Sequence, residues 1–296
     1  MFSNTTVTRK DNVIETLKAY VELLKVRLSL TVAFSGAFGY LLGVEHFTWG
    51  LFLLFSLAGF LLTGSSNIVN QIIERDSDKL MKRTQVRPLP TGRLSVIEAA
   101  VFSVILLLIS CLILFNVFNV NAGWVGFISF LLYSFAYTPL KKVGPIAVFI
   151  GAFPGAFPPM IGWLAATRHF GLEPGILFAI QFFWQFPHFW AIAWVADQDY
   201  KKAGIRLLPG HGQKDLRTAL NIMLYTLFLI PLSWVPYELG MTGITSTFVA
   251  VVCGGLFLVQ AFRLMQTCTD KAALQMMFGS FIYLPVVQIA FLLDKV

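Results

Sequence analysis

The sequence predicts an all-α polytopic membrane protein with nine transmembrane helices and a cytoplasmic N-terminus. Of its 296 residues, 57% are hydrophobic and only 12% are charged, about half the charged fraction of an ordinary soluble domain. Nine apolar segments each approach the roughly 20 residues that cross a bilayer. With the N-terminus inside, 20 of the 22 Lys and Arg residues fall on the cytoplasmic side, as the positive-inside rule requires.

The nine expected spans follow one another with short connections, and their odd number places the two termini on opposite sides of the membrane. The net charge of +7 then reports membrane orientation, and no nucleic-acid partner is expected. The three cysteines are scattered and form no C-x-x-C pair, so they indicate neither a metal site nor a disulfide framework. The expected spans are residues 28–44, 50–70, 96–115, 122–138, 146–166, 175–196, 219–236, 244–262 and 275–293.

The segment 1–27 is expected to be a cytoplasmic N-terminal region, and residues 28–296 a single membrane domain. Apolar residues recur at helical spacing in 12–25, which predicts a helix lying along the membrane interface. The N-terminal residues lack the pattern of a cleaved signal peptide and of an Arg- and Ser-rich transit peptide. These features favour the bacterial cytoplasmic (inner) membrane, with the mitochondrial inner membrane as the alternative.

Small residues and prolines mark two of the expected spans. Gly36, Gly39 and Gly43 are spaced for close helix packing in the first span, as are Gly151 and Gly155 in the fifth. The fifth span also holds several prolines, and such an irregular helix is tolerated where neighbours or a cavity satisfy the freed backbone groups.

A cluster of charges follows the second span directly, at residues 67–93. Asn70, Glu74 and Asp78 are four residues apart, so on a continuing helix they stack on one face. Asp76 falls on the opposite face and is expected to be solvated or paired with a neighbouring Lys or Arg. Placing carboxylates at a membrane boundary carries a desolvation cost, so such groups usually face a cavity and bind a ligand. An oxygen-bearing face beside six Lys and Arg residues indicates a magnesium–diphosphate site.

The loop at 196–218 repeats this layout after the sixth span. It opens with Asp197 and Asp199, continues with Lys201, Lys202 and Arg206, and then reaches a proline. The two acidic segments face the same side, where Mg²⁺ would need only one or two carboxylates plus substrate phosphates. His188 lies inside the sixth span, where it either bonds a neighbouring side chain or contacts an acceptor or a metal centre.

These motifs resemble the UbiA superfamily of intramembrane prenyltransferases. The segment NQIIERDSD carries its first acidic motif, and RTQVRPLPTGR matches the Arg-rich segment that follows. The stretches ELLKVRLSL, YTPLKK, GAFPGAFPPMIGW, WQFPHFWAIAW and DYKKAGIRLLP resemble the haem-farnesylating branch. The resemblance implies a helical bundle with a central cavity that uses Mg²⁺. Its implied substrates are farnesyl diphosphate and haem B, and its implied products are haem O and diphosphate.

The resemblance also implies roles for individual residues. Glu74 stands where the superfamily usually has Asp, and Asp197 and Asp199 are two rather than four apart, which leaves open whether Asp197 binds metal. His188 is the residue expected to touch the haem acceptor. Haem-modifying or oxidase-assembly proteins are further partner candidates. The implied metal ligands are Asn70, Glu74, Asp78 and Asp199, and the implied diphosphate-binding residues are Lys82, Arg83, Arg87, Lys142 and Lys202.

Three other functions fit parts of the pattern. A prenyltransferase for an aromatic or quinone precursor would share the first acidic motif. A transporter would share the broken helices and the pseudo-repeat, but its acidic residues are expected near the bilayer midplane and not at span ends. A structural assembly factor would not need the two acidic and basic loops.

Overall fold

The computed structural model describes residues 9–210 and 212–296, and its long elements are helices. Nine helical segments in the described part are long and apolar enough to cross a membrane. They confirm the nine spans that the sequence predicts. The spans are α2 (Val26–Gly43), α3 (Trp49–Asp78), α4 (Val96–Ile113) with η1 (Leu114–Phe118), α5 (Val120–Leu131) with η2 (Leu132–Tyr137) and α6 (Thr138–Leu140), α7 (Ile146–Thr167), α8 (Leu172–Val195), α10 (Leu216–Leu232) with α11 (Val235–Glu238), α12 (Ile244–Thr267) and α13 (Asp270–Leu293).

Two further helices lie outside the spans: α1 (Arg9–Leu23) and α9 (Asp197–Lys202). Helix α1 covers most of the segment for which an interfacial helix is expected, and it exposes Val13, Ile14, Leu17 and Val21. A helix that exposes a row of apolar side chains is suited to the membrane interface. Residues 1–8 of the expected N-terminal segment lie outside the described residues.

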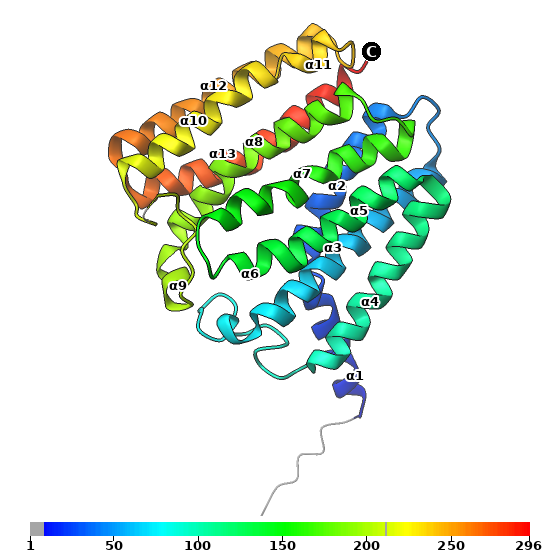
Figure 1. Ribbon diagram of the computed structural model, residues 1–296, viewed down its shortest axis with the longest axis vertical. Coiled ribbons are helices and arrows are strands. Elements are labelled where there is room, and N and C mark those ends of the chain that lie inside the picture. The colour runs from blue at the N-terminus through cyan, green and yellow to red at the C-terminus, as the bar shows by residue number, and fades with distance from the viewer. Residues whose placement is uncertain (1–8, 211) are drawn as a thin grey trace, which may run out of the picture.

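The spans pack side by side as one bundle (Figure 1). Helix α2 packs against α3, α7 and α13, while α8 lies between α7 on one side and α10 and α13 on the other. The connections 79–95, 141–145 and 196–215 gather at the end of the bundle that carries α1 and α9, opposite the C-terminus (Figure 1). We call this end the charged end, because these connections hold most of the loop Lys and Arg residues.

Helix α3 is longer than the sequence predicts. The expected span stops at residue 70, whereas the helix continues without a break to Asp78 and is 30 residues long. Polar residues usually signal a loop, but Asn70, Glu74 and Asp78 are buried on this extension and paired with cations. The extra turns carry the candidate acidic face into the protein.

The crossing of α2 and α7 depends on glycine. A Cβ atom at Gly39 would overlap the backbone of Pro159, and one at Gly162 would overlap the backbone of Gly36. Gly155 likewise leaves room for the side chain of Gln185 on α8. The close packing that the small-residue spacing predicts is therefore present, with an additional glycine contributed by α7.

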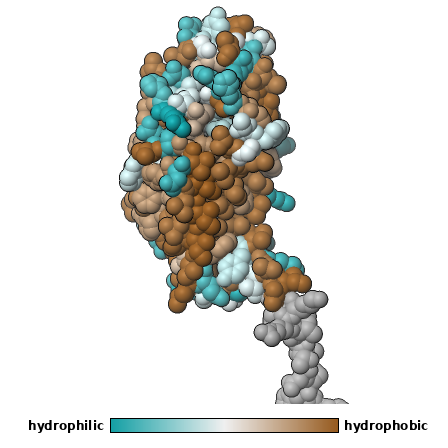
Figure 2. Space-filling model, turned by 90° about the vertical axis from the view of Figure 1, so that its right-hand side faces the viewer, coloured by the Kyte–Doolittle hydropathy of each residue, from teal (hydrophilic) through white to brown (hydrophobic). Residues whose placement is uncertain are grey.

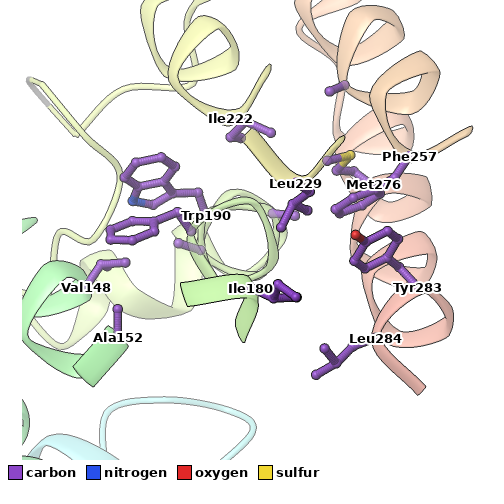
Figure 3. Packing of buried hydrophobic residues seen from close by; sticks show 14 of the residues in the cluster. Val148, Ala152, Ile180, Trp190, Ile222, Leu229, Phe257, Met276, Tyr283 and Leu284 are labelled. Carbon is purple, nitrogen blue, oxygen red and sulfur yellow. The ribbon is translucent and has the colours of Figure 1, made fainter. Parts of the chain in front are cut away.

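The interior is apolar and so is the middle of the outer surface. One buried cluster joins α7, α8, α10, α12 and α13, and includes Trp190, Ile222, Leu229 and Met276 (Figure 3). Hydrophobic residues dominate the middle of the face in Figure 2, with hydrophilic residues concentrated toward its ends. An apolar band between polar ends is what a bilayer requires of a protein that spans it.

Candidate active site

The three polar side chains predicted to share a face of α3 are buried together at its C-terminal end. The exposed fractions of Asn70, Glu74 and Asp78 are 1%, 7% and 0%. Each one meets a cation from a different segment of the chain, which offsets much of the cost of removing charge from water. Lys25 Nζ lies 3.0 Å from Asn70 Oδ1, Lys141 Nζ lies 2.8 Å from Glu74 Oε1, and Arg87 Nη1 lies 2.7 Å from Asp78 Oδ2.

Of these three cations, the sequence predicted only Arg87. Lys25 lies in the turn between α1 and α2 and has a left-handed backbone, with φ of 48°. Lys141 follows α6 directly. Both stand at the ends of spans, next to the charged end, and both lie in stretches that resemble the haem-farnesylating branch, ELLKVRLSL and YTPLKK, but neither signal names the partner of the lysine. A buried carboxylate needs a cation, yet nothing local to α3 says which distant segment provides it.

The electrostatic environments of the two lysines differ. Burial, together with repulsion from Arg87 and Lys141, lowers the pKa of Lys25 to about 7. Burial also disfavours the charged form of Lys141, but its contacts with Tyr137 and Glu74 raise its pKa above the usual value. Lys141 is therefore a fixed cation beside the acidic face.

A π-helical segment places the residues that support this face. Helix η2 ends at Tyr137, whose ring centroid lies 4.6 Å from Lys141 Nζ in a cation–π contact. Thr138 follows, accepting a hydrogen bond from Asn70 Nδ2 at 3.2 Å and donating one to the Tyr133 carbonyl at 2.8 Å. The Tyr133 carbonyl also accepts the backbone N–H of Thr138, the five-residue hydrogen bond of a π-helical turn, and such turns are common at functional sites.

The donor set fits a magnesium ion that also binds substrate phosphate. Asp78 Oδ1 is buried and has no hydrogen-bond partner, although the second oxygen of the same carboxylate binds Arg87. Glu74 and the amide of Asn70 add two more oxygen-bearing groups on one face. Among the described residues, no three His, Cys, Asp or Glu side chains gather to hold a metal ion by themselves. Mg²⁺ often needs no such cage, because substrate phosphates and waters complete its coordination.

The second acidic segment forms α9 at the same end of the bundle. Asp197 pairs with Lys201 at 2.8 Å, and Asp199 pairs with Lys202 at 3.4 Å. The guanidinium of Arg83 lies over the ring of Tyr200 in α9, 5.9 Å from its centroid, which joins the two charged loops. The role of Asp199 as a metal ligand stays a prediction.

Among the described residues, the remaining cations predicted to bind diphosphate form no ion pair with the acidic face of α3. Lys82 is exposed, and Lys142 is exposed on the wall of a separate cavity. Asp76 points away from the site and pairs with Arg75 and Lys79 at the surface, as its position in the helix predicts.

His188 lies in α8 against α13. It is buried, its Nδ1 is 2.7 Å from the Ser280 hydroxyl, and its ring stacks on Trp184 at 4.5 Å between centroids. The edge of Phe281 completes its surroundings at 5.0 Å. The histidine is thus hydrogen-bonded to a neighbour, one of the two states that the sequence left open, and contact with an acceptor stays a prediction.

Comparison with known proteins identifies the family. Residues 31–284 match the model of the UbiA prenyltransferase family. The chain belongs to this family. The fold and the family that the sequence motifs suggest are therefore confirmed.

Curated relatives in the UbiA family match over nearly their whole length. The chain is 57% identical over 280 residues to the protoheme IX farnesyltransferase of Cytophaga hutchinsonii, covering 94% of this chain and 98% of that protein. It is 45% identical to the protoheme IX farnesyltransferase of Flavobacterium psychrophilum, covering 93% of this chain and 94% of that protein.

Solved structures share the UbiA fold at low sequence identity. A structure described as digeranylgeranylglyceryl phosphate synthase superposes with a TM-score of 0.79 at 24% identity, covering 95% of this chain and 98% of that one. A UbiA homologue from Archaeoglobus fulgidus, bound to DMAPP and Mg²⁺, has a TM-score of 0.67 at 16% identity and covers 92% and 98%. At these identities, the likeness establishes the fold.

Proposed function

We propose that this protein transfers a farnesyl group from farnesyl diphosphate to a vinyl group of haem B, giving haem O and diphosphate. The observation that carries the proposal is the pairing of three buried polar side chains on α3 with three cations from three other segments. The names of the curated relatives support haem as the acceptor.

The donor diphosphate binds at the acidic face of α3. In the free protein, Arg87 and Lys141 neutralise the carboxylates of Asp78 and Glu74. When the donor binds, the same cations share their charge with its phosphate oxygens, and Arg can bind two of these oxygens at once. Lys25 adds a third cation when its amine is protonated, and Lys82, Arg83 and Lys202 remain further candidates.

Mg²⁺ is the proposed cofactor, held by Asn70, Glu74 and Asp78, with Asp199 as the candidate ligand from the second loop. When bound, it neutralises the diphosphate as a leaving group. The buried, unpartnered Oδ1 of Asp78 is the observation that favours a cation at this place.

The reaction needs no covalent enzyme intermediate. The C1–O bond of farnesyl diphosphate breaks, the electron pair leaves with the diphosphate, and an allylic cation develops. The π electrons of a haem vinyl group attack C1 and form the new C–C bond. Water then captures the resulting carbocation and releases a proton, which leaves a hydroxyethylfarnesyl substituent. Lys25, Arg87 and Lys141 stabilise the charge that builds up on the leaving group.

The surroundings of the site suit a cationic intermediate. Tyr133 and Tyr137 lie next to one another, with ring centroids 5.2 Å apart, directly beside Lys141. Aromatic faces attract cations, and an apolar site excludes water until the C–C bond has formed. His188 is the proposed contact of the haem acceptor.

The protein is a multi-pass membrane protein, and its proposed location is the bacterial cytoplasmic membrane. The curated relatives are bacterial. Proteins that modify haem further or assemble oxidases are proposed as partners that receive the product.

A product assay tests the proposal. Membranes that contain the protein are incubated with haem B, farnesyl diphosphate and Mg²⁺, with and without a chelator, and the extracted haems are separated and weighed by mass spectrometry. A more apolar haem that has gained a farnesyl group and a hydroxyl group, and that is absent with chelator, is the expected result. Unchanged haem from correctly folded protein would overturn the haem assignment.

The alternatives predict different outcomes. A prenyltransferase for aromatic or quinone precursors would consume farnesyl diphosphate with such an acceptor and leave haem unchanged. A transporter would place its acidic residues near the bilayer midplane, whereas Glu74 and Asp78 occupy the last turns of α3 at the charged end.

A further inference from the structure

A cavity opens at the charged end, close in sequence to the candidate active site but lined by other residues. Its volume is about 620 Å³, within the range of roughly 300–1,000 Å³ that is typical of small-molecule sites. The lining comes from the loop between α6 and α7, from Lys201 in the last turn of α9 and from the segment that follows α9. None of the three polar residues of the α3 face lines it.

The lining is positively charged. Lys142, Lys201 and Arg206 contribute cations, and no Asp or Glu lines the cavity among the described residues. Asp197 neutralises Lys201 from behind, through the ion pair at 2.8 Å. Lys142 and Arg206 are exposed and form no ion pair among the described residues, so two positive charges remain uncompensated.

Glycines shape the wall around these cations. Gly144, Gly204 and Gly212 all have positive φ, at 147°, 70° and 69°. Gly212 lies along the arginine stem, since a Cβ atom there would stand 3.5 Å from the side chain of Arg206, an ordinary contact, and its positive φ is what favours glycine. The backbone conformations here favour glycine and hold the two loops around an open space.

The cavity and the diphosphate site share one loop. Lys141 reaches Glu74 on α3, while the next residue, Lys142, lines the cavity. A ligand held by Lys142 is therefore a neighbour of a donor held by Lys141. Two adjacent anion sites suit a reaction in which donor and acceptor both carry negative groups.

We propose that this cavity binds the two propionate groups of the haem acceptor, with Lys142 and Arg206 as their partners. The inference rests on the proposed function. Haem B carries its propionates on the edge of the porphyrin opposite its vinyl groups. The two uncompensated cations equal the two carboxylates in number and carry the opposite charge. Anchoring that edge in water at the charged end leaves the vinyl edge for the apolar interior, as the transfer requires.

Esterification of the acceptor tests the proposal directly. Steady-state kinetics are measured with haem B, with haem B dimethyl ester and with farnesyl diphosphate as the varied substrate, in wild type and in the double variant Lys142→Gln/Arg206→Gln. Each charge-assisted hydrogen bond is worth about tenfold in KM, so the double variant, which loses two of them, raises KM for haem B about 100-fold. KM for farnesyl diphosphate stays unchanged. The ester reacts with wild type as poorly as haem B reacts with the variant, and the variant does not weaken it further.

Arg217→Gln provides the matched control, because Arg217 is an exposed arginine at the start of α10 that does not line the cavity. The proposal is overturned if the double variant raises KM for farnesyl diphosphate instead, which would assign Lys142 to the donor as the sequence suggests. It is also overturned if the ester binds wild type as well as the free acid does.

A binding measurement separates this inference from the proposed function. The Soret band of haem B is titrated with detergent-solubilised protein in the absence of donor. Wild type that binds haem while the double variant binds it equally well would overturn the propionate site alone. Wild type that neither binds nor farnesylates haem, yet prenylates an aromatic acceptor, would overturn the proposed function and the propionate site with it.

Discussion

Asp78 and Asp76 belong to the same helix turn but face opposite environments, which makes them a matched pair for testing the acidic face. Asp78 is fully buried with one oxygen unpartnered, whereas the Asp76 side chain is 72% exposed and pairs with surface cations. We expect Asp78→Asn to lower kcat/KM by roughly 100-fold or more, the scale seen when one electrostatic group of an active site is removed. Asp76→Asn retains wild-type activity, and equal losses in both variants would exclude a specific role for Asp78.

Lys141 and Glu74 form a buried ion pair, so a single substitution has two effects that can be separated. Lys141→Gln leaves the Glu74 carboxylate without its partner, and breaking a buried pair usually costs about 3–5 kcal/mol of stability. We expect Lys141→Gln to lower the thermal midpoint and to raise KM for farnesyl diphosphate.

The double variant Lys141→Gln/Glu74→Gln removes both charges. It recovers most of the thermal midpoint but not the activity, because the donor still lacks its cation and the proposed Mg²⁺ lacks its Glu74 ligand. Recovered turnover in this double variant would show that the pair is structural only. Differential scanning fluorimetry and the product assay, run on the same preparations, provide the two readouts.

At the scale of elements, η2 connects backbone geometry to the site. The hydroxyl of Thr138 bridges Asn70 and the Tyr133 carbonyl, which also accepts the Thr138 backbone N–H in the π-helical turn. Thr138→Val keeps the shape and removes both hydrogen bonds. We expect a change in the Mg²⁺ dependence of the reaction, with about a tenfold higher metal concentration for half-maximal rate, the lower end of losses from removed outer-shell partners of metal ligands. Thr138→Ser restores the wild-type dependence, which a purely steric role would not predict.

The crossing of α2 and α7 is the element contact most sensitive to side-chain volume. Gly39→Ala places a methyl group where the Pro159 backbone already lies. We expect a loss of about 1–3 kcal/mol, typical of overpacking, read as a lower thermal midpoint. Gly175→Ala in α8 has open space around its Cβ and is the control. An unchanged midpoint for Gly39→Ala would mean that the two helices separate at little cost.

The same elements show what the sequence could predict and what it could not. Span number follows from apolar length, and the shared face of Asn70, Glu74 and Asp78 follows from helical spacing. The length of α3 does not, because a polar segment continues as helix only when partners elsewhere compensate its charges. Lys25 and Lys141 are those partners, 45 and 67 residues away from the groups they bind. Their pairing is a property of the assembled bundle, so no local pattern reveals it.

At the scale of the whole molecule, the distribution of charge predicts which side of the membrane each end of the bundle faces. The connections 79–95, 141–145 and 196–215 share the charged end with α1 (Figure 1), and the positive-inside rule assigns this end to the cytoplasm. The opposite end carries the turns between α2 and α3 and between α7 and α8. Substrate diphosphate and haem would therefore enter from the cytoplasm.

Cysteine labelling tests this orientation. The three native cysteines, Cys111, Cys253 and Cys268, are replaced by Ala, and single cysteines are introduced as Gln85→Cys at the charged end and His46→Cys at the opposite end, both at exposed positions. A membrane-impermeant maleimide added to intact spheroplasts is expected to label position 46 and not position 85, whereas inside-out vesicles give the reverse. Labelling of position 85 in spheroplasts would show that the charged end faces away from the cytoplasm. Isoprenoid diphosphates are made in the cytoplasm. A diphosphate site that opened on the other side of the membrane could not be reached by the proposed donor.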